Sequence, residues 1–437
     1  MNVCMIGAGY VGLVSGACFA EFGVRVVCAD KDESRIAMLE RGEIPIYEPG
    51  LAAIVQRNLR EGRLSFTSDT ASAVGQALVV FIAVQTPNGH DGSTDLGAVE
   101  AVAREIGRTM DGYKVVVTKS TVPVGTSYRV RAWIEEELAS RGASHRFSVA
   151  SNPEFLREGA AIADFMRPDR VVIGADDDEA IAILRDLYRP LYLIETPFVI
   201  TNIPTSELTK YAANAFLATK ISFINEMANY CEKVGGDVHA IARGIGLDKR
   251  IGSKFLHPGP GYGGSCFPKD TRSAAHFARQ AGEGFEIIEA AIRVNERQRL
   301  RMVEKIERAL GGDVTGRTLA VLGLSFKPET DDMRDAPSIE ILGALQQRGA
   351  RVRAFDPAAM ANAERVIPGL ELCKNEYETC ENADALVLLT EWNQFRMLDL
   401  ARIRSLLREP VLVDLRNVYE PEQMRRAGFR YESVGRS

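Results

Sequence analysis

Short, largely apolar runs alternate with stretches of helical periodicity along most of the chain. In the first half, such runs fall at 2–6, 25–29, 78–84, 114–118 and 147–150, followed by others at 170–173 and 198–201. Runs of this length are typical of parallel strands that are buried on both faces. The pattern therefore predicts a parallel α/β domain in which the last two runs are edge strands.

A long helical segment follows this domain. From Thr205 to about Val234, apolar residues recur at helical spacing. A helix of this length spans about 45 Å at ~1.5 Å per residue, so it is predicted to join two domains. Further helical material continues to about Leu310. A second alternating unit then has predicted strands at 318–323, 351–355, 385–390 and 411–414 and a helix at 338–347.

Together these patterns predict an α/β fold with two Rossmann-like parallel-sheet domains joined by a long central helix. The predicted boundaries give an N-terminal domain at 1–203, a central helical region at 204–310 and a C-terminal domain at 311–437. The central region would also carry a glycine-rich loop that contains a cysteine.

Composition narrows the functional class. The chain has 437 residues, 46% hydrophobic and 26% charged, as in ordinary globular proteins. Its net charge of −6 argues against nucleic acid or an acidic membrane surface as the main partner. Seven cysteines without a CxxC pair, and five histidines without ligand spacing, predict neither a metal site nor a disulfide framework. The N-terminal run contains glycines and is not a signal peptide, and no apolar run of about 18 residues occurs, so a cytoplasmic location is expected.

The first predicted strand leads into Gly7-Ala-Gly9-Tyr-Val-Gly12, which opens a helix. Gly7 permits a tight turn, Gly9 lets a pyrophosphate approach, and Gly12 lets helix and strand pack closely. Asp30 ends the second strand, where it can accept hydrogen bonds from a ribose. Because a carboxylate repels a 2′-phosphate, these residues predict an NAD site rather than an NADP site. The alternative is a helix–sheet turn that binds no cofactor.

Polar residues follow the next strands at their carboxyl ends, where ligands of such sheets bind. Thr86 and Thr121 are predicted to face the nicotinamide half of NAD. Glu154 and Glu158 are four residues apart and are predicted to share a helix face. Each acid has an alternative interpretation as a solvated surface residue, but their position after a buried strand favours a site for at least one.

The stretch Gly259-Pro-Gly-Tyr-Gly-Gly264 is predicted to form neither a helix nor a regular strand. Cys266, Lys269 and Asp270 follow it directly. A thiol beside a glycine loop and both signs of charge indicates a nucleophile. The alternative is a turn with a buried structural cysteine.

Lys210 and Asn214 lie one turn apart on the long predicted helix. The sequence around Lys210 is nearly free of charge, so a buried ammonium there would need a partner. The two side chains are candidates to donate hydrogen bonds to an oxyanion, although a solvated lysine fits the sequence equally well.

These residues together indicate a four-electron oxidation. NAD removes hydride from an alcohol carbon, and Cys266 would add to the resulting aldehyde. The thiohemiacetal would give up a second hydride to a second NAD, and the thioester would be hydrolysed to a carboxylate. Asp270 or Glu154 would act as the base through water.

Several motifs resemble the UDP-glucose/GDP-mannose dehydrogenase family, in order and over essentially the whole chain. They are Ile6-Gly-Ala-Gly-Tyr-Val-Gly-Leu13, Lys119-Ser-Thr-Val-Pro-Val-Gly125, Asn152-Pro-Glu-Phe-Leu156, Glu207-Leu-Thr-Lys-Tyr-Ala-Ala-Asn-Ala-Phe216, Gly261-Tyr-Gly-Gly-Ser-Cys-Phe-Pro-Lys-Asp270 and Gly323-Leu-Ser-Phe-Lys-Pro328. The resemblance implies NAD-dependent oxidation of UDP-glucose to UDP-glucuronate, for polysaccharide biosynthesis, through a cysteine thioester. It also implies NAD binding by the N-terminal domain, UDP-sugar binding by the C-terminal domain and a homodimer formed through the central region.

The resemblance assigns roles residue by residue. The implied catalytic residues are Thr121, Glu154, Lys210, Asn214, Cys266 and Asp270. The implied NAD-binding residues are Gly7, Gly9, Tyr10, Val11, Gly12, Asp30, Arg35, Thr86, Thr121, Glu158, Lys269 and Arg334. The implied substrate-binding residues are Glu154, Phe155, Leu156, Lys210, Asn214, Phe255, Leu256, His257, Pro258, Gly259, Gly263 and Lys327. Arg250 resembles an arginine that reaches the neighbouring subunit's sugar site, and Arg416 is a further candidate of that kind.

The nucleotide sugar stays open at this stage. Sister enzymes oxidise GDP-mannose or UDP-N-acetylhexosamines, although the cysteine motif is closer to the UDP-glucose branch. A two-electron dehydrogenase of the 6-phosphogluconate type shares the domain plan but would not need Cys266. A regulator that binds NAD or a nucleotide sugar without turnover would not need a thiol nucleophile either.

Overall fold

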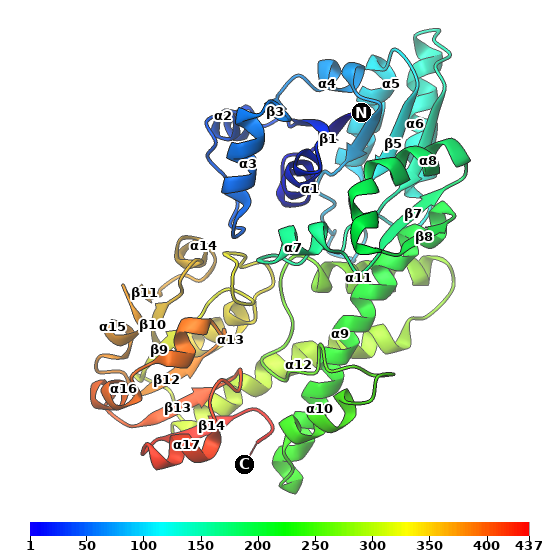
Figure 1. Cartoon of the computed structure of the whole chain (residues 1–437). Helices are drawn as coiled ribbons and strands as arrows, with labels where there is room; N and C mark the ends of the chain where they lie inside the picture. The colour runs from blue at the N-terminus through cyan, green and yellow to red at the C-terminus, as the bar shows by residue number, and fades with distance from the viewer. Residues whose placement is uncertain (437) are drawn as a thin grey trace. The chain divides into compact units, whose positions relative to one another are not determined.

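The computed structural model describes residues 1–436 and consists of two compact units, Met1–Ala213 and Asn214–Ser437. Figure 1 labels the elements of both units. The predicted C-terminal domain includes Ser437, which lies outside the described residues, and the predicted division into three parts stays a prediction.

Unit 1 is built on an eight-stranded sheet. Its strands are β1 (Asn2–Ile6), β2 (Arg25–Ala29), β3 (Leu64–Thr67), β4 (Val79–Ile82), β5 (Lys114–Thr118), β6 (Phe147–Ser151), β7 (Val171–Ala175) and β8 (Phe198–Thr201). Its helices are α1 (Tyr10–Glu21), α2 (Glu33–Glu40), α3 (Leu51–Arg60), α4 (Thr70–Gln76), α5 (Gly97–Thr109), α6 (Thr126–Ser140), α7 (Ala161–Met166), α8 (Asp178–Leu187) and the short 3₁₀ helix η1 (Arg189–Ile194).

Alternating side chains of the strands fill two separate cores. On β1, Val3 and Met5 belong to one hydrophobic cluster, whereas Cys4 and Ile6 belong to another. Successive side chains of a strand point to opposite faces, so the sheet is covered on both sides. This explains why the strands of unit 1 are apolar at nearly every position.

The strand order of unit 1 is β3-β2-β1-β4-β5-β6-β7-β8. All neighbouring strands are parallel except β6 and β7, which are antiparallel. The prediction of two edge strands is therefore half wrong. β8 is an edge strand, but β7 lies inside the sheet because it pairs with β6 on one side and β8 on the other.

The long helix α9 (Ile203–Val234) begins in unit 1 and continues into unit 2. Unit 2 has the strands β9 (Thr318–Leu322), β10 (Arg351–Phe355), β11 (Glu371–Leu372), β12 (Ala385–Leu388), β13 (Val411–Asp414) and β14 (Arg430–Ser433). Its helices are α10 (Val238–Gly246), α11 (Phe267–Gln280), α12 (Glu286–Ala309), α13 (Pro337–Gln347), α14 (Met360–Val366), α15 (Glu376–Cys380), η2 (Asn393–Met397), α16 (Leu400–Leu406) and α17 (Pro421–Arg426).

The second sheet is wholly parallel, in the order β11-β10-β9-β12-β13-β14. This is the strand order of a dinucleotide-binding fold, and the first six strands of unit 1 repeat it. The predicted fold class, two Rossmann-like sheets with a long helix between them, is therefore confirmed.

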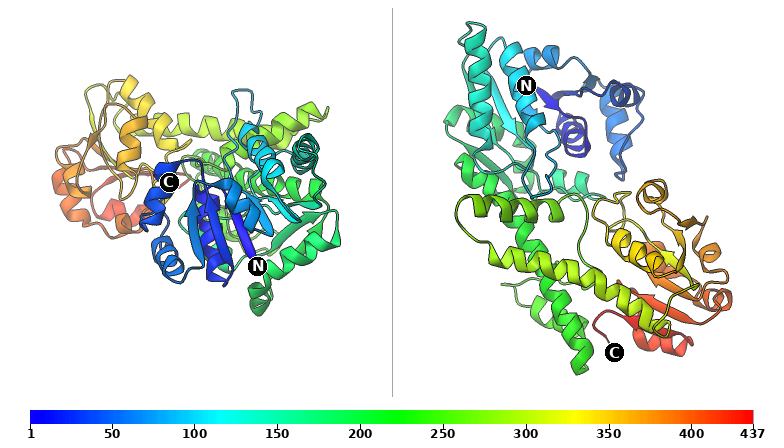
Figure 2. Two further views of the ribbon diagram at one scale, coloured as in Figure 1. Left: turned by 90° about the horizontal axis from the view of Figure 1, so that it is seen from above. Right: turned by 180° about the vertical axis from the view of Figure 1, so that it is seen from behind.

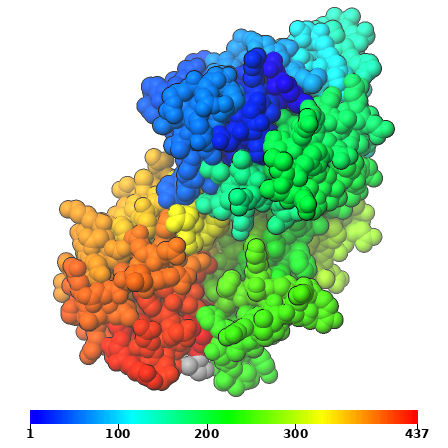
Figure 3. All heavy atoms as spheres, viewed as in Figure 1, coloured from blue at the N-terminus to red at the C-terminus, as the bar shows by residue number. Residues whose placement is uncertain are grey.

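Two helices form the rest of the framework of unit 2. The α9 segment of this unit packs on α12, where the Ser222 hydroxyl donates to the Ala291 carbonyl at 2.7 Å and the Asn229 amide donates to Gln298 at 2.8 Å (Figure 2). Gly435 lies against α10, because the Val238 N–H donates to the Gly435 carbonyl at 2.9 Å. Figure 3 shows the C-terminal part of unit 2 (red) beside its green helical part. Within residues 1–436, no helix combines the length and the apolar character needed to cross a membrane.

Candidate active site

The turn after β1 holds the first group of predicted site residues. Gly7 has a left-handed φ of 103°, and a Cβ on Gly12 would lie 1.8 Å from the Gly7 carbonyl oxygen. Both positions therefore require glycine. Gly9 is the N-cap of α1 and makes no side-chain capping bond, and the first turn, which begins with Tyr10 and Val11, contains no acidic residue. The N–H groups at this helix end therefore suit an anion such as a pyrophosphate.

The carboxylate of Asp30 lies directly beside this turn. One oxygen accepts the Ala8 N–H at 2.7 Å and an Arg35 N–H at 3.0 Å, and the other accepts the Asp32 N–H at 3.0 Å. Arg35 also pairs with Asp32 at 3.6 Å. Two carboxylates around one arginine keep the local charge negative, which fits ribose hydroxyls better than a 2′-phosphate. The residues present therefore fit NAD.

Glu48, for which the sequence pattern gave no signal, connects the start of α1 to the turn that contains Glu158. Its carboxylate accepts hydrogen bonds from the Tyr10 hydroxyl, from the Gly159 N–H at 2.7 Å and from the Ala161 N–H at 2.8 Å. Burial and then the bond to Glu48 raise the pKa of Tyr10 above its usual value, so its hydroxyl stays a donor. Glu48 thereby fixes the position of the Glu158 turn.

Two predicted threonines meet at the carboxyl ends of β4 and β5. The Thr86 hydroxyl donates to the Thr121 carbonyl at 2.9 Å. The neighbouring Ser120 hydroxyl donates to the Val84 carbonyl at 2.6 Å, so the two loops are joined twice. Ligands of doubly wound sheets bind at this edge. The structure brings Thr86 and Thr121 together, and their contact with nicotinamide stays a prediction.

Glu154 and Lys210 form a buried ion pair at the same edge. Their charged atoms are 3.1 Å apart, and the side chains are 7% and 4% exposed. This pair supplies the partner that the charge-poor sequence around Lys210 predicted. The Lys210 ammonium also lies 5.3 Å from the centre of the Phe155 ring, and Glu154 accepts the Leu156 N–H at 2.5 Å. Both charges are thus held by several contacts, as burial requires.

The prediction that Glu154 and Glu158 share a helix face is wrong. Residues 152–157 have no regular structure, and a turn follows at 158–159. Pro153 restricts the residue before it to extended conformations, and Gly159 has a left-handed φ of 77°. The segment therefore leaves β6 as a loop, in which Glu154 contacts Lys210 and Glu158 lies in the turn fixed by Glu48.

In unit 2, the predicted glycine loop lies between α10 and α11, and its residues 259–264 form neither helix nor strand, as predicted. Gly261 and Gly264 have φ of 108° and 82°. A Cβ on Gly263 would lie 2.4 Å from the Asp335 carbonyl oxygen, and one on Gly264 would lie 2.7 Å from the Phe326 ring. These glycines are needed because other backbone and ring atoms of unit 2 approach them closely.

Buried polar side chains hold this loop. They are Asn225 on α9 and Asn295, Gln298 and Arg299 on α12, each no more than 8% exposed. Asn295 accepts the Tyr262 N–H at 2.8 Å and donates to the Tyr262 carbonyl at 3.0 Å. In the same way, Asn225 accepts the Gly259 N–H at 2.8 Å, and Gln298 donates to the Gly259 carbonyl at 2.9 Å. The backbone of the loop is thus fixed by hydrogen bonds at Gly259 and Tyr262, which a flexible surface loop would lack.

Cys266 is the N-cap of α11, and its side chain is partly exposed. One turn further, the Asp270 N–H donates to the Cys266 carbonyl at 2.8 Å. The Asp270 carboxylate, 1% exposed, accepts the Asn214 amide at 2.6 Å and pairs with the Lys269 ammonium at 2.7 Å. Four predicted residues therefore form one cluster at the N-terminal end of α11, where the helix dipole favours negative charge.

The predicted substrate residues of unit 2 lie around the glycine loop. Phe255 has a left-handed φ of 64°, uncommon for a bulky residue. Arg416, which follows β13, donates to the Leu389 and Phe326 carbonyls at 2.8 Å each. A Cβ on Gly259 would lie 3.4 Å from the Arg416 guanidinium, so this arginine touches the start of the loop. The adjoining residues are Leu256 and Pro258, which are buried, and His257, which is exposed.

Three predicted cations of unit 2 differ in their surroundings. The Arg334 guanidinium pairs with Asp332 at 2.9 Å, and the Arg334 carbonyl accepts the Gly264 N–H at 2.9 Å. The Lys327 ammonium lies 5.4 Å from the Phe326 ring. Arg250 is on the surface after α10, where its side chain is 89% exposed and pairs with Asp248 at 2.6 Å. The structure thus places Arg334 at the glycine loop and Arg250 in solvent.

The predicted catalytic residues therefore form one cluster in each unit. Lys210 joins Glu154 and the strand ends of unit 1, and Asn214 joins the cysteine cluster of unit 2. The two are one turn apart on α9, and the division between the units falls between them. One helix thus carries a residue of each cluster.

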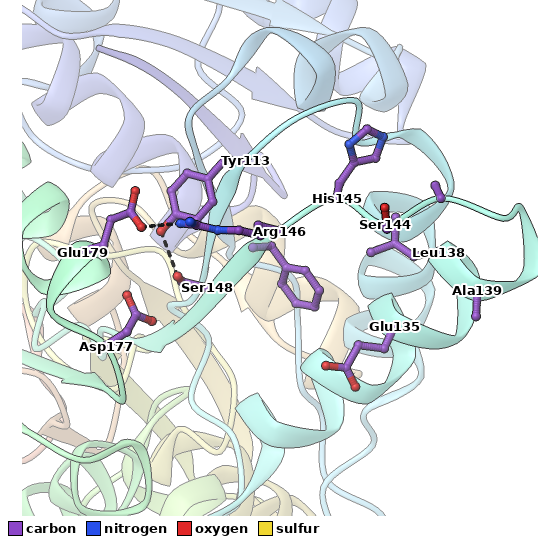
Figure 4. Close-up of a pocket in the computed structure, with 12 residues that line it drawn as sticks. Tyr113, Glu135, Leu138, Ala139, Ser144, His145, Arg146, Ser148, Asp177 and Glu179 are labelled. Atoms are coloured by element: carbon purple, nitrogen blue, oxygen red, sulfur yellow. Dashed lines mark hydrogen bonds and ion pairs between the residues drawn. The ribbon is translucent and has the colours of Figure 1, made fainter.

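A separate pocket of about 610 Å³ opens on unit 1 and contains none of these residues. Figure 4 shows Arg146 beside the ring of Tyr113, with its guanidinium bonded to Glu179 at 2.6 Å, while the Tyr113 hydroxyl meets Ser148 at 2.8 Å. Four of its polar side chains are thus bonded to each other in two pairs. It lies at the amino ends of β5 and β6, whereas ligands of this fold bind at the carboxyl ends.

Family models match all three parts of the chain. They are the NAD binding domain (residues 1–192), the central domain (204–297) and the UDP binding domain (320–421) of the UDP-glucose/GDP-mannose dehydrogenase family. The predicted cofactor class, NAD, and the predicted family are confirmed by these matches.

Relatives match over the full length. The chain is 55% identical to UDP-glucose 6-dehydrogenase of Rhizobium meliloti (strain 1021), with 100% of both chains covered. It is 49% identical to UDP-glucose 6-dehydrogenase TuaD of Bacillus subtilis (strain 168), covering 100% of this chain and 93% of that one. A solved UDP-glucose dehydrogenase from Pyrobaculum islandicum is 40% identical with a TM-score of 0.91, covering 100% of this chain and 98% of that one. The chain belongs to the UDP-glucose/GDP-mannose dehydrogenase family.

Proposed function

We propose that the chain oxidises UDP-glucose at C6 to UDP-glucuronate, with NAD as the acceptor of four electrons in two steps. The observation that carries this proposal is the cluster at the start of α11, where Cys266 and the buried Asp270 lie one helical turn apart. The relatives at 49–55% identity are UDP-glucose 6-dehydrogenases, which supports the same substrate. Two-electron oxidation of an alcohol requires no thiol beside the acid.

The thiol of Cys266 serves the second half of the reaction. Loss of a proton and a hydride converts the C6 alcohol to an aldehyde. The Cys266 sulfur then bonds to that carbon, and the thiol proton passes to the carbonyl oxygen. Loss of the hydroxyl proton and a second hydride gives a thioester, and attack by water breaks the C–S bond and restores the thiol. The aldehyde is never released.

The remaining predicted residues bind, orient and move protons. Lys210 and Asn214 donate hydrogen bonds to the C6 oxygen, whose negative charge grows as the thiol or water adds. Asp270 holds the hydrolytic water as its base, and Glu154 and Thr121 orient the reacting carbon. NAD, when bound, accepts the hydride. The glycine turn, Asp30 and Arg35 would hold its pyrophosphate and ribose, with Thr86, Glu158, Lys269 and Arg334 as further contacts.

The substrate residues of unit 2 are proposed to hold the nucleotide sugar. The buried polar residues of α9 and α12 hold the backbone at Gly259, which ends the segment from Phe255, and at Tyr262, which precedes Gly263. This supports a rigid backbone site. Lys327 supplies positive charge for a diphosphate, whereas the Arg416 guanidinium pairs with Glu391 at 3.0 Å and supports the loop. Phe155 and Leu156, in unit 1, stay predicted substrate residues.

The ratio of NADH formed to UDP-sugar consumed tests the four-electron proposal. Because both oxidations occur before release, we expect about two NADH per UDP-glucose and UDP-glucuronate as the sole sugar product. Absorbance at the NADH band with chromatography of the nucleotide sugars measures both quantities. A ratio near one would instead indicate a two-electron dehydrogenase.

A panel of nucleotide sugars tests the substrate. A solved UDP-D-ManNAc dehydrogenase from Pyrococcus horikoshii is 27% identical to this chain, and a solved GDP-mannose dehydrogenase from Pseudomonas aeruginosa is 32% identical. Both identities are well below the 55% of the UDP-glucose enzyme. We therefore expect the highest kcat/KM with UDP-glucose among UDP- and GDP-hexoses. A higher value with GDP-mannose or a UDP-N-acetylhexosamine would reassign the sugar.

A homodimer is proposed to form through α9. Phe216, Phe223 and Tyr230 are seven residues apart, so they form one stripe along the helix, and they are 66%, 47% and 62% exposed. We expect wild-type protein to sediment near twice the chain mass of 47.9 kDa and the double variant Phe216→Glu/Phe223→Glu to sediment as a monomer. Met397→Glu, at a position 86% exposed elsewhere in unit 2, is the matched control. Monomeric wild-type protein at micromolar concentration would contradict the proposal.

A cytoplasmic location is part of the proposal. The seven cysteines all lie within the described residues 1–436, where none of them forms a disulfide. Thiols are kept reduced in the cytosol, whereas oxidising compartments favour disulfides. The proposed role of Cys266 as a nucleophile needs the same reduced state.

A further inference from the structure

Two buried lysines flank the same strand. Lys114 begins β5 and Lys119 follows its last residue, and they are 4% and 2% exposed. The Lys114 ammonium donates to the Gly75 carbonyl at 2.8 Å and pairs with Asp111 at 3.6 Å. In residues 1–436, by contrast, no carboxylate forms an ion pair with Lys119. Lys119 lies at the carboxyl end of the strand, next to the residues proposed for catalysis.

The groups that directly contact the Lys119 ammonium are neutral. It donates to the Asn152 side-chain oxygen at 3.0 Å and to the Tyr188 hydroxyl at 3.3 Å, and it lies 5.7 Å from the centre of the Phe81 ring. The Tyr188 hydroxyl donates to the same Asn152 oxygen at 2.6 Å. Asn152 is further fixed because its amide donates to the Val172 carbonyl at 2.8 Å. The ammonium thus anchors the Asn152 side chain, which Tyr188 and the Val172 carbonyl also hold by hydrogen bonds.

Burial of the Lys119 ammonium lowers the stability of the folded chain. Taking an ammonium out of water without a carboxylate partner is strongly destabilising. A methionine has nearly the same length and would fill the space without that penalty. Burial lowers the pKa of Lys119 from 10.5 to about 8, and the nearby charges of Glu154 and Lys210 act in opposite directions on it. The lysine is therefore mostly charged at neutral pH, at a cost in stability.

We infer that Lys119 is a positioning residue for the reaction, which holds the turn carrying Glu154 through its bond to Asn152. Asn152 is separated from Glu154 only by Pro153, whose ring fixes one backbone angle. A shift of Asn152 is therefore transmitted to the Glu154 carboxylate and to its ion pair with Lys210. This inference rests on the proposed role of that pair.

The test compares Lys119→Met with Lys114→Met, a matched change at the other end of the same strand. For Lys119→Met we expect kcat to fall by about 10- to 100-fold, the effect of misplacing a reacting group by about 1 Å, with the dissociation constant of NAD unchanged. Lys119→Arg, which keeps the cation, should recover part of the lost kcat. Lys114→Met should keep the wild-type kcat.

Melting temperature separates positioning from support of the fold. The folded-state pKa of Lys119, about 8, is below 10.5, so between these pH values the unfolded chain binds more protons and wild-type stability rises with pH. Lys119→Met lacks this rise. Its melting temperature should equal or exceed that of wild type at pH 7, with an advantage that shrinks toward pH 10.

Two results would overturn the inference. One is a kcat of Lys119→Met within twofold of wild type. The other is a melting temperature several degrees lower at pH 7 with activity lost in parallel, which would make Lys119 a structural residue. Because all variants are compared with wild type on whichever sugar it oxidises, a wrong sugar or a ratio of one NADH would refute the proposed function without affecting this comparison.

Discussion

Replacing Cys266 with serine is expected to abolish formation of UDP-glucuronate, with kcat lowered by on the order of 10³-fold or more, as for removal of other nucleophiles. A serine hydroxyl is almost wholly protonated at neutral pH, whereas a thiol is partly ionised and intrinsically more nucleophilic. The first oxidation does not use the sulfur, so the variant should stall at an aldehyde-level or covalent species. NAD binding should be unchanged. Product analysis by chromatography and NAD titration by fluorescence measure the two effects.

Cys373→Ser is the matched control for this substitution. Cys373 is buried in unit 2, 4% exposed, and its thiol contacts the Glu371 carbonyl at 3.7 Å. A serine hydroxyl can make the same bond, so this variant should keep full activity. Undiminished UDP-glucuronate production by Cys266→Ser would exclude the thiol mechanism.

The parts of the fold that could be predicted depend on neighbouring residues in the sequence. The β1–α1 turn is an example, because a Cβ on Gly12 would clash with the carbonyl of Gly7, which lies only five residues earlier. The ion pair of Lys210 was also foreseeable, since a lysine in an apolar helix needs a partner. The carboxylate that supplies it, Glu154, lies 56 residues earlier, and only its position after a strand marked it as a candidate.

Other features depend on contacts between distant segments, which a pattern of neighbouring residues does not reveal. The spacing of Glu154 and Glu158 predicts a shared helix face, but Pro153 and Gly159 make this segment a loop. Asn295 and Gln298 lie in a strongly charged stretch of α12 that reads as solvent-exposed, yet both are buried against the glycine loop. Lys119 begins the family motif that ends at Gly125. Its burial without a carboxylate becomes visible only when β4, β5 and β6 are assembled in the sheet.

Asp270 and Cys266 differ in their exposure and in the contacts that hold their side chains. Cys266 is partly exposed, so a substrate carbon can approach its sulfur. The same sulfur forms a hydrogen bond of 3.5 Å with the Ser265 hydroxyl. Asp270 is enclosed between the Asn214 amide and the Lys269 ammonium, which hold its carboxylate in one orientation. Such fixed orientation is what a base acting through water requires. The two residues should therefore fail at different steps when each is changed.

Asp270→Asn is expected to lower kcat by about 10²- to 10³-fold, within the range for loss of a general base. The amide keeps the size of the side chain but removes its charge, so hydrolysis of the thioester slows while both oxidations proceed. Rapid mixing should show a burst of about two NADH per active site, followed by slow turnover. Mass spectrometry of protein quenched after the burst should detect the sugar nucleotide attached to Cys266.

Asp335→Asn is the matched control for this substitution, because Asp335 also lies at the glycine loop but its side chain is 37% exposed and pairs only loosely with Arg272 at 3.4 Å. It should turn over at the wild-type rate without a burst. The Lys269 ammonium loses its counter-charge in Asp270→Asn, so a lower melting temperature is expected there but does not bear on the step assignment. If Asp270→Asn turned over slowly with neither a burst nor an adduct, Asp270 would act before the thioester forms, and its assignment as the hydrolytic base would be wrong.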